Sequence, residues 1–139
     1  KFNFVFNHFS AQKKRKKKID FLIYYRKHPN KEKLFPYSFV KKLINYKFKI
    51  HVIGDNLNLP HVKNYGKISN KRVLKLQSTA NYTIASKENL YSFFTIECLS
   101  NNVKIIIKKD NINKIKFFKK KIMRIDFNNH KDLKKLKKL

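Results

Sequence analysis

Residues 82–107 read YTIASKENLYSFFTIECLSNNVKIII, and this stretch decides the fold. Its two apolar ends are rich in β-branched and aromatic residues, which predicts strands at 80–86 and 103–107. Between them, Ser92 is a good N-cap for a helix that runs to about Ser100, and the asparagine pair that follows suits a left-handed C-cap. A strand, a helix and a second strand in this order predict a parallel pair joined by a right-handed crossover.

The same alternation continues on both sides of this stretch. Apolar runs predict further strands at 20–25, 48–54 and 122–126, and the continuous run 20–25 is expected to be buried on both faces. A polar loop is expected after the first of these strands, and a loop with Pro60 after the second. Pro36 suits the first turn of one helix, and Ser69 or Asn70 caps another that ends near Gln77. Strands that alternate with helices of this length predict an α/β fold, an open Rossmann-like parallel sheet with helices on both faces.

The chain divides into three parts. Residues 1–18 combine an aromatic piece with a lysine run, and we interpret them as a linker or the remnant of an interdomain segment. Residues 19–128 form the Rossmann-like domain. Residues 129–139 predict a basic amphipathic helix with three leucines, which either packs on the domain or lies on an anionic membrane. We favour packing.

The charge of the chain has two interpretations. The formal net charge is +27 at pH 7, and lysine outnumbers arginine by 31 to 4. A protein selected to hold phosphates would use more arginine, whose planar fork binds them in pairs of hydrogen bonds. We therefore attribute most of the charge to compositional bias. A basic nucleic-acid-binding domain remains the alternative.

Other composition signals narrow the class of protein. No apolar run approaches the roughly 18 residues that a membrane-spanning helix needs. Cys98 is the single cysteine, so no disulfide framework or CxxC zinc pattern exists, and we expect a buried thiol in a reducing compartment. The chain begins at Lys1 and has no signal-peptide pattern, so we expect a fragment or the C-terminal part of a longer protein.

Polar residues follow three of the predicted strands, and the carboxyl ends of strands are where open α/β sheets bind ligands. Arg26 to Lys31 follow the first strand, Gly54 and Asp55 follow the second, and residues 86–92 lead from the third into a helix. A helix N-terminus attracts anions, and a basic pair can neutralise a diphosphate. The sequence therefore predicts an anion site at this edge.

Residues 86–106, SKENLYSFFTIECLSNNVKII, resemble the signature EGFGLPxxEAxAxGxPVI of the large retaining family of GT-B glycosyltransferases. In the alignment, Glu97 takes the place of the second glutamate of the signature. Arg26 and Lys31 match the arginine and lysine of the family's GRLxxxKG loop. The resemblance covers about residues 20–127, which is most of the chain.

The resemblance implies the donor-binding half of a hexosyltransferase. Such an enzyme transfers a sugar from a nucleotide-diphosphate sugar to a hydroxyl of a glycan or lipid-linked acceptor, in glycan or cell-surface polysaccharide synthesis. The implied catalytic residues are Arg26, Lys31 and Glu88. The implied donor-binding residues are Glu97, Asn89, Tyr91, Ser92, Gly66 and Ile68. No cofactor or metal is required, because fixed cations can hold the diphosphate.

The chain departs from the family pattern in ways that keep alternatives open. Glu88 and Glu97 are separated by eight residues, whereas the family has seven, so strict alignment puts Asn89 at the place of the first glutamate. Either the loop has one extra residue and Glu88 keeps the role, or the role of the first carboxylate is lost or taken by Asn89. The GFG of the signature is Leu90, Tyr91 and Ser92 here, so both of its glycines are replaced. A non-catalytic GT-B-like scaffold is therefore a further alternative. The N-terminal GT-B domain is missing, so we expect a partial enzyme, cytoplasmic and in peripheral contact with the inner face of the membrane.

Overall fold

The computed structural model describes residues 16–32, 34–85, 90–111 and 114–138. The strands within these ranges are β1 (Ile19–Tyr25), β2 (Ile50–Gly54), β3 (Val62–Asn64), β4 (Ala80–Ile84), β5 (Lys104–Lys108) and β6 (Ile122–Ile125). The helices are α2 (Pro29–Glu32), α3 (Tyr37–Asn45), α4 (Asn70–Gln77), α5 (Phe93–Ser100) and α6 (His130–Lys138), with a 3-10 turn at Lys119–Lys121.

All strands of the described residues pair in parallel in one open sheet of order β3-β2-β1-β4-β5-β6. Strands β2 and β3 lie on one side of β1, and strands β4, β5 and β6 lie on the other side. This is the strand order of a Rossmann-like fold, and the order reverses between β1 and β4. The predicted fold class is confirmed.

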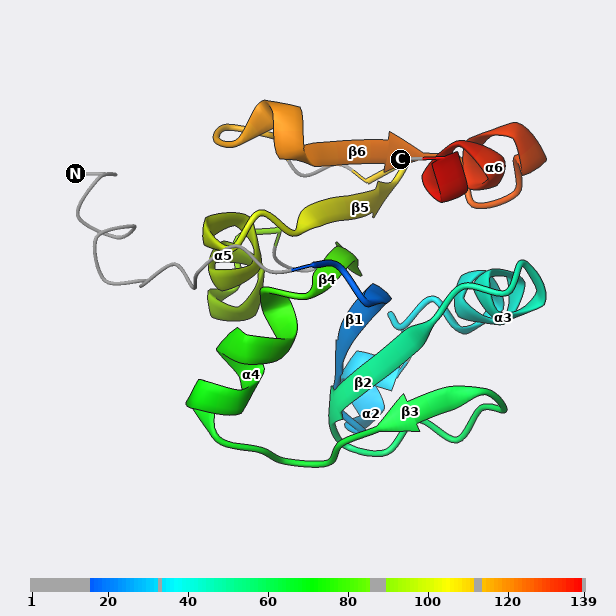
Figure 1. Cartoon of the computed structure of the whole chain (residues 1–139). Helices are drawn as coiled ribbons and strands as arrows, with labels where there is room; N and C mark the ends of the chain where they lie inside the picture. Colours follow the sequence, from blue (N-terminus) through cyan, green and yellow to red (C-terminus); the bar gives the residue numbers. More distant parts are fainter. Residues whose placement is uncertain (1–15, 33, 86–89, 112–113, 139) are drawn as a thin grey trace.

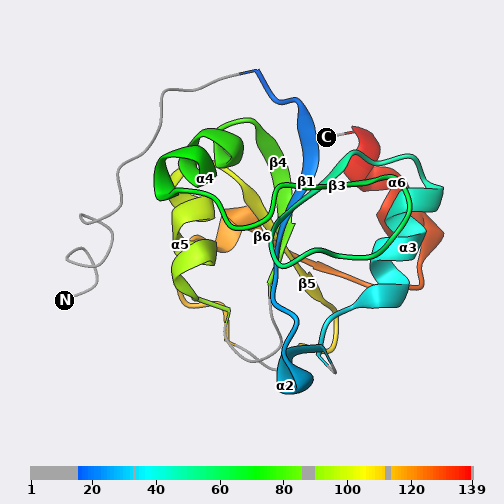
Figure 2. The ribbon, with the colours of Figure 1, turned by 90° about the horizontal axis from the view of Figure 1, so that it is seen from below.

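The helices form a layer on each face of the sheet. Figure 1 shows α4 and α5 on one face and α3 and α6 on the other, and Figure 2 shows the same two layers from below. We call these the α4–α5 face and the α3–α6 face. This arrangement follows from the alternation of strands and helices, because a parallel crossover places its helix on a face of the sheet.

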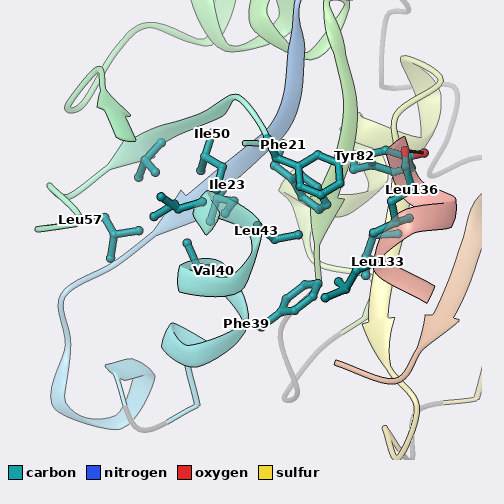
Figure 3. Close-up of a cluster of buried hydrophobic side chains, with 14 of the residues drawn as sticks. Phe21, Ile23, Phe39, Val40, Leu43, Ile50, Leu57, Tyr82, Leu133 and Leu136 are labelled. Atoms are coloured by element: carbon teal, nitrogen blue, oxygen red, sulfur yellow. Dashed lines mark hydrogen bonds between the residues drawn. The ribbon is translucent and has the colours of Figure 1, made fainter. Parts of the chain in front are cut away.

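Side chains of the strands alternate between two apolar cores. Phe21 and Ile23 of β1 join the core on the α3–α6 face, whereas Leu22 joins the core on the α4–α5 face. Figure 3 shows Phe21 with Leu43 of α3 and side chains of α6 in the first of these cores. A strand buried on both faces needs a continuous apolar run, and this explains the composition of β1.

The C-terminal helix α6 is part of the core on the α3–α6 face. Leu133 and Leu136 are only 1 % and 2 % exposed, and the hydroxyl of Tyr82 in β4 donates a hydrogen bond of 3.1 Å to the carbonyl of Leu136. Just before α6, the ring of Phe127 stacks on Phe39 of α3, with ring centroids 3.7 Å apart. The expected packing of this helix is confirmed. Among the described residues, no helix has the length and apolar character needed to cross a membrane.

Local capping chemistry agrees with the sequence. The Ser69 and Ser92 side chains accept hydrogen bonds from the backbone N–H groups of Arg72 and Thr95, which begins α4 and α5 at the predicted positions. Asn102 has φ of 60°, the left-handed conformation predicted for the end of α5. Cys98 is fully buried as expected, and this burial raises the pKa of its thiol well above the usual value.

Three details differ from the sequence prediction. Residues 62–64 form the edge strand β3, where we expected a loop. Residues 29–32 form the single turn α2 within what we expected to be a polar loop. Tyr24 was expected to be buried in a strand covered on both faces, but its side chain is exposed. It lies near the end of β1, where its ring stacks on Phe94 of α5 and stays partly open to solvent.

Candidate ligand site at the carboxyl edge of the sheet

The candidate site lies at the carboxyl edge of the sheet, beside the reversal of strand order between β1 and β4. Arg26 follows the last residue of β1 and is exposed. Figure 2 shows the end of β1, the turn α2 and the start of α5 together in the lower part of the view. Ligands of open α/β sheets bind at such a reversal, because the loops leave in opposite directions there and open a crevice.

The loop that carries Arg26 is tied to the end of β2. The Asp55 carboxylate accepts a hydrogen bond of 2.7 Å from the backbone N–H of Lys27, and the backbone N–H of Asp55 donates one of 2.9 Å to the carbonyl of Tyr25. The two bonds hold the residues on either side of Arg26. The backbone at Arg26 is therefore fixed at the edge, while its side chain extends into solvent.

Gly54 makes this close approach of the two strand ends possible. Its φ is +96°, and a Cβ at this position would lie 2.4 Å from the carbonyl oxygen of Tyr25. Its backbone N–H donates a hydrogen bond of 3.0 Å to the carbonyl of Gly66. Any other residue would push the end of β2 away from β1, because that contact is far shorter than a carbon and an oxygen tolerate.

Gly66 and Ile68 lie on the β2 side of the site. Gly66 has φ of +71°, and apart from its chain neighbours no atom lies within 4 Å of the place where a Cβ would be. The backbone at Gly66 is therefore open to a ligand. Ile68 is half-buried against the core of the α4–α5 face, so its side chain mainly supports the start of α4.

Tyr91 and Ser92 use their hydroxyl groups within the protein. The Tyr91 hydroxyl donates to the carbonyl of Phe117 and accepts from the backbone N–H groups of Lys116 and Phe117, at 2.8 to 2.9 Å. The Ser92 hydroxyl accepts from the backbone N–H of Thr95 and caps α5. These two residues shape the start of α5, and their predicted contacts with a donor stay predictions.

Three of the residues predicted for the site fall where the structure describes little or nothing. Glu88 and Asn89 lie outside the described residues. Lys31 belongs to the turn α2, which begins three residues after Arg26, but the described part does not include its side chain. Of the three predicted catalytic residues, Arg26 is therefore the one whose side chain the structure describes.

Glu97 lies between α4 and α5. Its carboxylate accepts a hydrogen bond of 3.3 Å from the side-chain amide of Gln77, which is fully buried at the end of α4. The amide of Asn101 in turn donates to the carbonyl oxygen of the Gln77 side chain over 3.2 Å. Burial raises the pKa of Glu97, and the hydrogen bond from Gln77 partly opposes this.

The position of Gln77 separates the Glu97 carboxylate from Arg26. Gln77 precedes Ala80, the first residue of β4, and Ala80 pairs with Ile19, the first residue of β1. Arg26 follows the other end of β1, a strand of seven residues. At about 3.3 Å per residue, the two ends of that strand are roughly 20 Å apart. The structure brings the end of β1, which Arg26 follows, to the start of α5 through the contact of Tyr24 with Phe94, but it does not bring the Glu97 carboxylate there.

Sequence reasoning missed an aromatic pair at the same edge. The ring of Tyr24 in β1 stacks on Phe94 in the first turn of α5, with centroids 5.6 Å apart and planes inclined by 27°. A tyrosine in an apolar run normally indicates core, so the run itself gave no signal. The position of Tyr24 two residues before Arg26, at a strand end, is the signal that could have found it.

Positive charge is not gathered on one face of the described structure. Exposed lysines lie on α3 and α6, and exposed basic residues also lie on α4, in the opposite layer. The α3–α6 set is Lys41, Lys131, Lys134, Lys135 and Lys137. The α4 set is Lys71, Arg72 and Lys75. Within the described ranges, no three His, Cys, Asp or Glu side chains are grouped as metal ligands.

Comparison with protein-family models and with curated proteins finds no match to the chain. We therefore describe the chain by its fold and by the residues at its candidate site. The chain forms a Rossmann-like α/β domain whose carboxyl edge, at the reversal of strand order, carries an exposed arginine, an open glycine backbone and a stacked aromatic pair.

Proposed function

We propose that the chain is the donor-binding half of a GT-B glycosyltransferase, which transfers a hexose from a nucleotide-diphosphate sugar to an acceptor hydroxyl. One observation carries the proposal. Arg26 and the N-terminus of α5 lie at the same edge, on the neighbouring strands β1 and β4 between which the strand order reverses. This combination suits a diphosphate, and the sequence resemblance to the family supports the same ligand.

In this function the domain stabilises the leaving group. When the sugar departs, negative charge grows on the nucleoside diphosphate. The guanidinium of Arg26, the ammonium of Lys31 and the dipole of α5 would lower the energy of that charge in the transition state. These cations are part of the chain, so the proposal includes no metal and no other cofactor.

The other residues that we predict to bind the donor differ in how well the structure supports their role. The open backbone of Gly66 and the neighbouring Ile68 would lie beside the nucleoside. The role of Glu97 as a ribose ligand stays a prediction, because in this structure its carboxylate accepts a hydrogen bond from the side-chain amide of Gln77. The roles predicted for Glu88 and Asn89 also stay predictions. The proposal therefore depends on Arg26 and α5 and not on the glutamate pair.

In a GT-B enzyme the acceptor would be bound by a second, N-terminal domain, which would face the carboxyl edge. A glycan or a lipid-linked acceptor and a cytoplasmic site at the membrane surface are part of the same proposal. Because Leu133 and Leu136 of α6 are buried, any membrane contact by this helix would use its exposed lysines and the charge of anionic lipids.

Calorimetric titration with UDP, GDP and their hexose conjugates tests the proposal. We expect binding that Arg26→Ala weakens by about tenfold or more, because a charge-assisted hydrogen bond contributes about 1.5–3 kcal/mol. Lys134→Ala removes the same charge from the exposed side of α6 and should leave binding unchanged. Glu97→Ala, in the same series, tests the ribose role separately.

Two results would contradict the proposal. One is binding of the nucleotides that Arg26→Ala leaves unchanged. The other is tight, salt-sensitive binding of DNA or RNA without any binding of UDP or GDP, which would favour the nucleic-acid alternative. Nucleotide binding by the chain, together with no sugar transfer in the presence of an N-terminal GT-B domain, would favour the non-catalytic scaffold.

A further inference from the structure

Among the described residues, two large apolar side chains are exposed, and both belong to the candidate site. One lies near the end of β1 and the other is the first residue of α5. Tyr24 is 47 % exposed and Phe93 is 79 % exposed, whereas the other described phenylalanines and tyrosines are buried or half-buried. Phe94 follows Phe93 and stacks on Tyr24. Aromatic rings left in water cost free energy, so their concentration at one edge needs a cause.

Tyr24 of the stacked pair is close in the chain to Arg26 and close in space to Gly54. Tyr24 precedes Arg26 by two residues, which keeps their Cα atoms within about 7 Å. On its other side, a Cβ at Gly54 would lie 3.3 Å from the Tyr24 ring, and Gly54 is hydrogen-bonded to Gly66. A single nucleotide is long enough to reach from Arg26 to this ring.

We propose that Tyr24, held in place by its stack on Phe94, is the platform on which the base of the nucleoside diphosphate stacks. The inference rests on the proposed function, since it concerns the same nucleotide. A nucleobase is flat and has a π-face, as the ring of Tyr24 does. Such a stack contributes about 1–3 kcal/mol and accepts any base, with no need for hydrogen-bond readout.

The inclination of the pair suits this role. With planes 27° apart and centroids 5.6 Å apart, Phe94 covers part of Tyr24 and fixes the ring without enclosing it. The exposed part of the Tyr24 ring is left for a ligand. Beside Gly66, apart from its chain neighbours, no atom lies within 4 Å of the place where a Cβ would be, which leaves room for part of a ligand.

NMR titration of the ¹⁵N-labelled chain with UDP, with GDP and with inorganic pyrophosphate tests this platform. The variants are Tyr24→Leu, which keeps an apolar contact with Phe94 but has no π-face, and Tyr24→Phe, which keeps the ring. Tyr46→Leu is the matched control, because Tyr46 is a half-buried tyrosine just after α3, on the other side of the sheet. Thermal unfolding of each variant shows whether the fold is kept.

We expect Tyr24→Leu to lower the affinity for UDP and GDP by about 5- to 100-fold, which corresponds to the loss of one stacking contact. Tyr24→Phe and Tyr46→Leu should bind both nucleotides as the unchanged chain does. Pyrophosphate has no base, so its affinity should be the same for all variants.

Unchanged nucleotide affinity in Tyr24→Leu would overturn the platform and leave the proposed function intact. An equal loss for pyrophosphate and nucleotides would also overturn it, since Tyr24 would then merely support the edge. If the unchanged chain binds pyrophosphate but neither nucleotide, or binds none of the three, the platform and the proposed function both fail.

Discussion

The carboxylate of Asp55, just after β2, accepts a hydrogen bond of 2.7 Å from the backbone N–H of Lys27, just after β1. This bond ties the loop after β1, which contains Arg26, to the loop after β2, so we infer that Asp55 is a positioning residue for Arg26. Sequence reasoning had placed Asp55 at this edge but had given it no partner. Its effect should therefore appear in the mobility of the loop and in nucleotide affinity.

Asp55→Ala should release the loop. Hydrogen exchange at the Lys27 amide should accelerate, and UDP affinity should fall about 2- to 10-fold, because one exposed hydrogen bond contributes about 0.5–1.5 kcal/mol. Asp55→Asn keeps an acceptor oxygen and should restore most of both effects. Exchange by NMR checks the first result without any ligand. An unchanged Lys27 exchange rate in Asp55→Ala would contradict the positioning role.

Gly54→Ala should destabilise the fold far more than Gly66→Ala. Both glycines have positive φ, so each substitution costs about 1–2 kcal/mol in backbone conformation. At Gly54 the new Cβ also meets the Tyr25 carbonyl at 2.4 Å, and we expect a total of at least about 3 kcal/mol. Urea unfolding of the two variants measures the difference, and equal losses would show that the strand ends can separate freely.

Glu97→Gln should stabilise the chain increasingly as pH rises from 4 to 7. Burial raises the pKa of Glu97 above its usual value of 4.5, so the folded state favours the protonated carboxyl. The unchanged chain therefore loses stability as pH rises through that raised pKa, whereas a glutamine at 97 does not titrate. Melting temperatures of both proteins across this range check the trend.

UDP affinity measured on Glu97→Gln separates the structural role of Glu97 from a role in ligand binding. Glutamine can still accept the hydrogen bond from Gln77, so the α4–α5 contact should persist. If Glu97 nevertheless binds the ribose of a donor, Glu97→Gln would lower the affinity for UDP while raising the stability of the fold. A difference in melting temperature that shrinks toward neutral pH would contradict the assigned burial.

Leu136→Ala should cost about 2–5 kcal/mol of unfolding free energy, because it leaves a cavity in the core on the α3–α6 face. Lys134→Ala changes an exposed residue of the same helix and should have little effect. Urea unfolding compares the two variants. If Leu136→Ala were as mild as Lys134→Ala, α6 would not belong to the core in solution.

Much of the fold was predictable because its signals are local. Ser69 and Ser92 cap helices through their own hydroxyl groups, and Asn102 adopts the left-handed conformation that its short polar side chain tolerates. Strand β3 was not predictable, because three residues with one apolar side chain carry no periodic pattern. Its pairing with β2 determines its conformation.

The site was less predictable, because its geometry depends on contacts between distant residues. The sequence placed Glu97 on α5 but could not indicate its partner Gln77, which lies 20 residues earlier on another helix. Nor could it indicate that Tyr24 meets Phe94, 70 positions later. The direction of a side chain within a layer is decided by tertiary packing, and local propensity does not contain it.

The stack of Phe127 on Phe39 has a consequence for how the chain folds during synthesis. Phe39 belongs to the first helix of the α3–α6 face, and the segment that covers it is made almost 90 residues later. Lys42 of the same helix is hydrogen-bonded to the Phe127 carbonyl and the Asn128 side chain, so both contacts wait for the same segment. Contacts so distant in sequence slow folding. While the ribosome adds the intervening strands, the part of α3 that Phe127 and α6 later cover stays open, and this half-built layer is where a chaperone would be expected to bind.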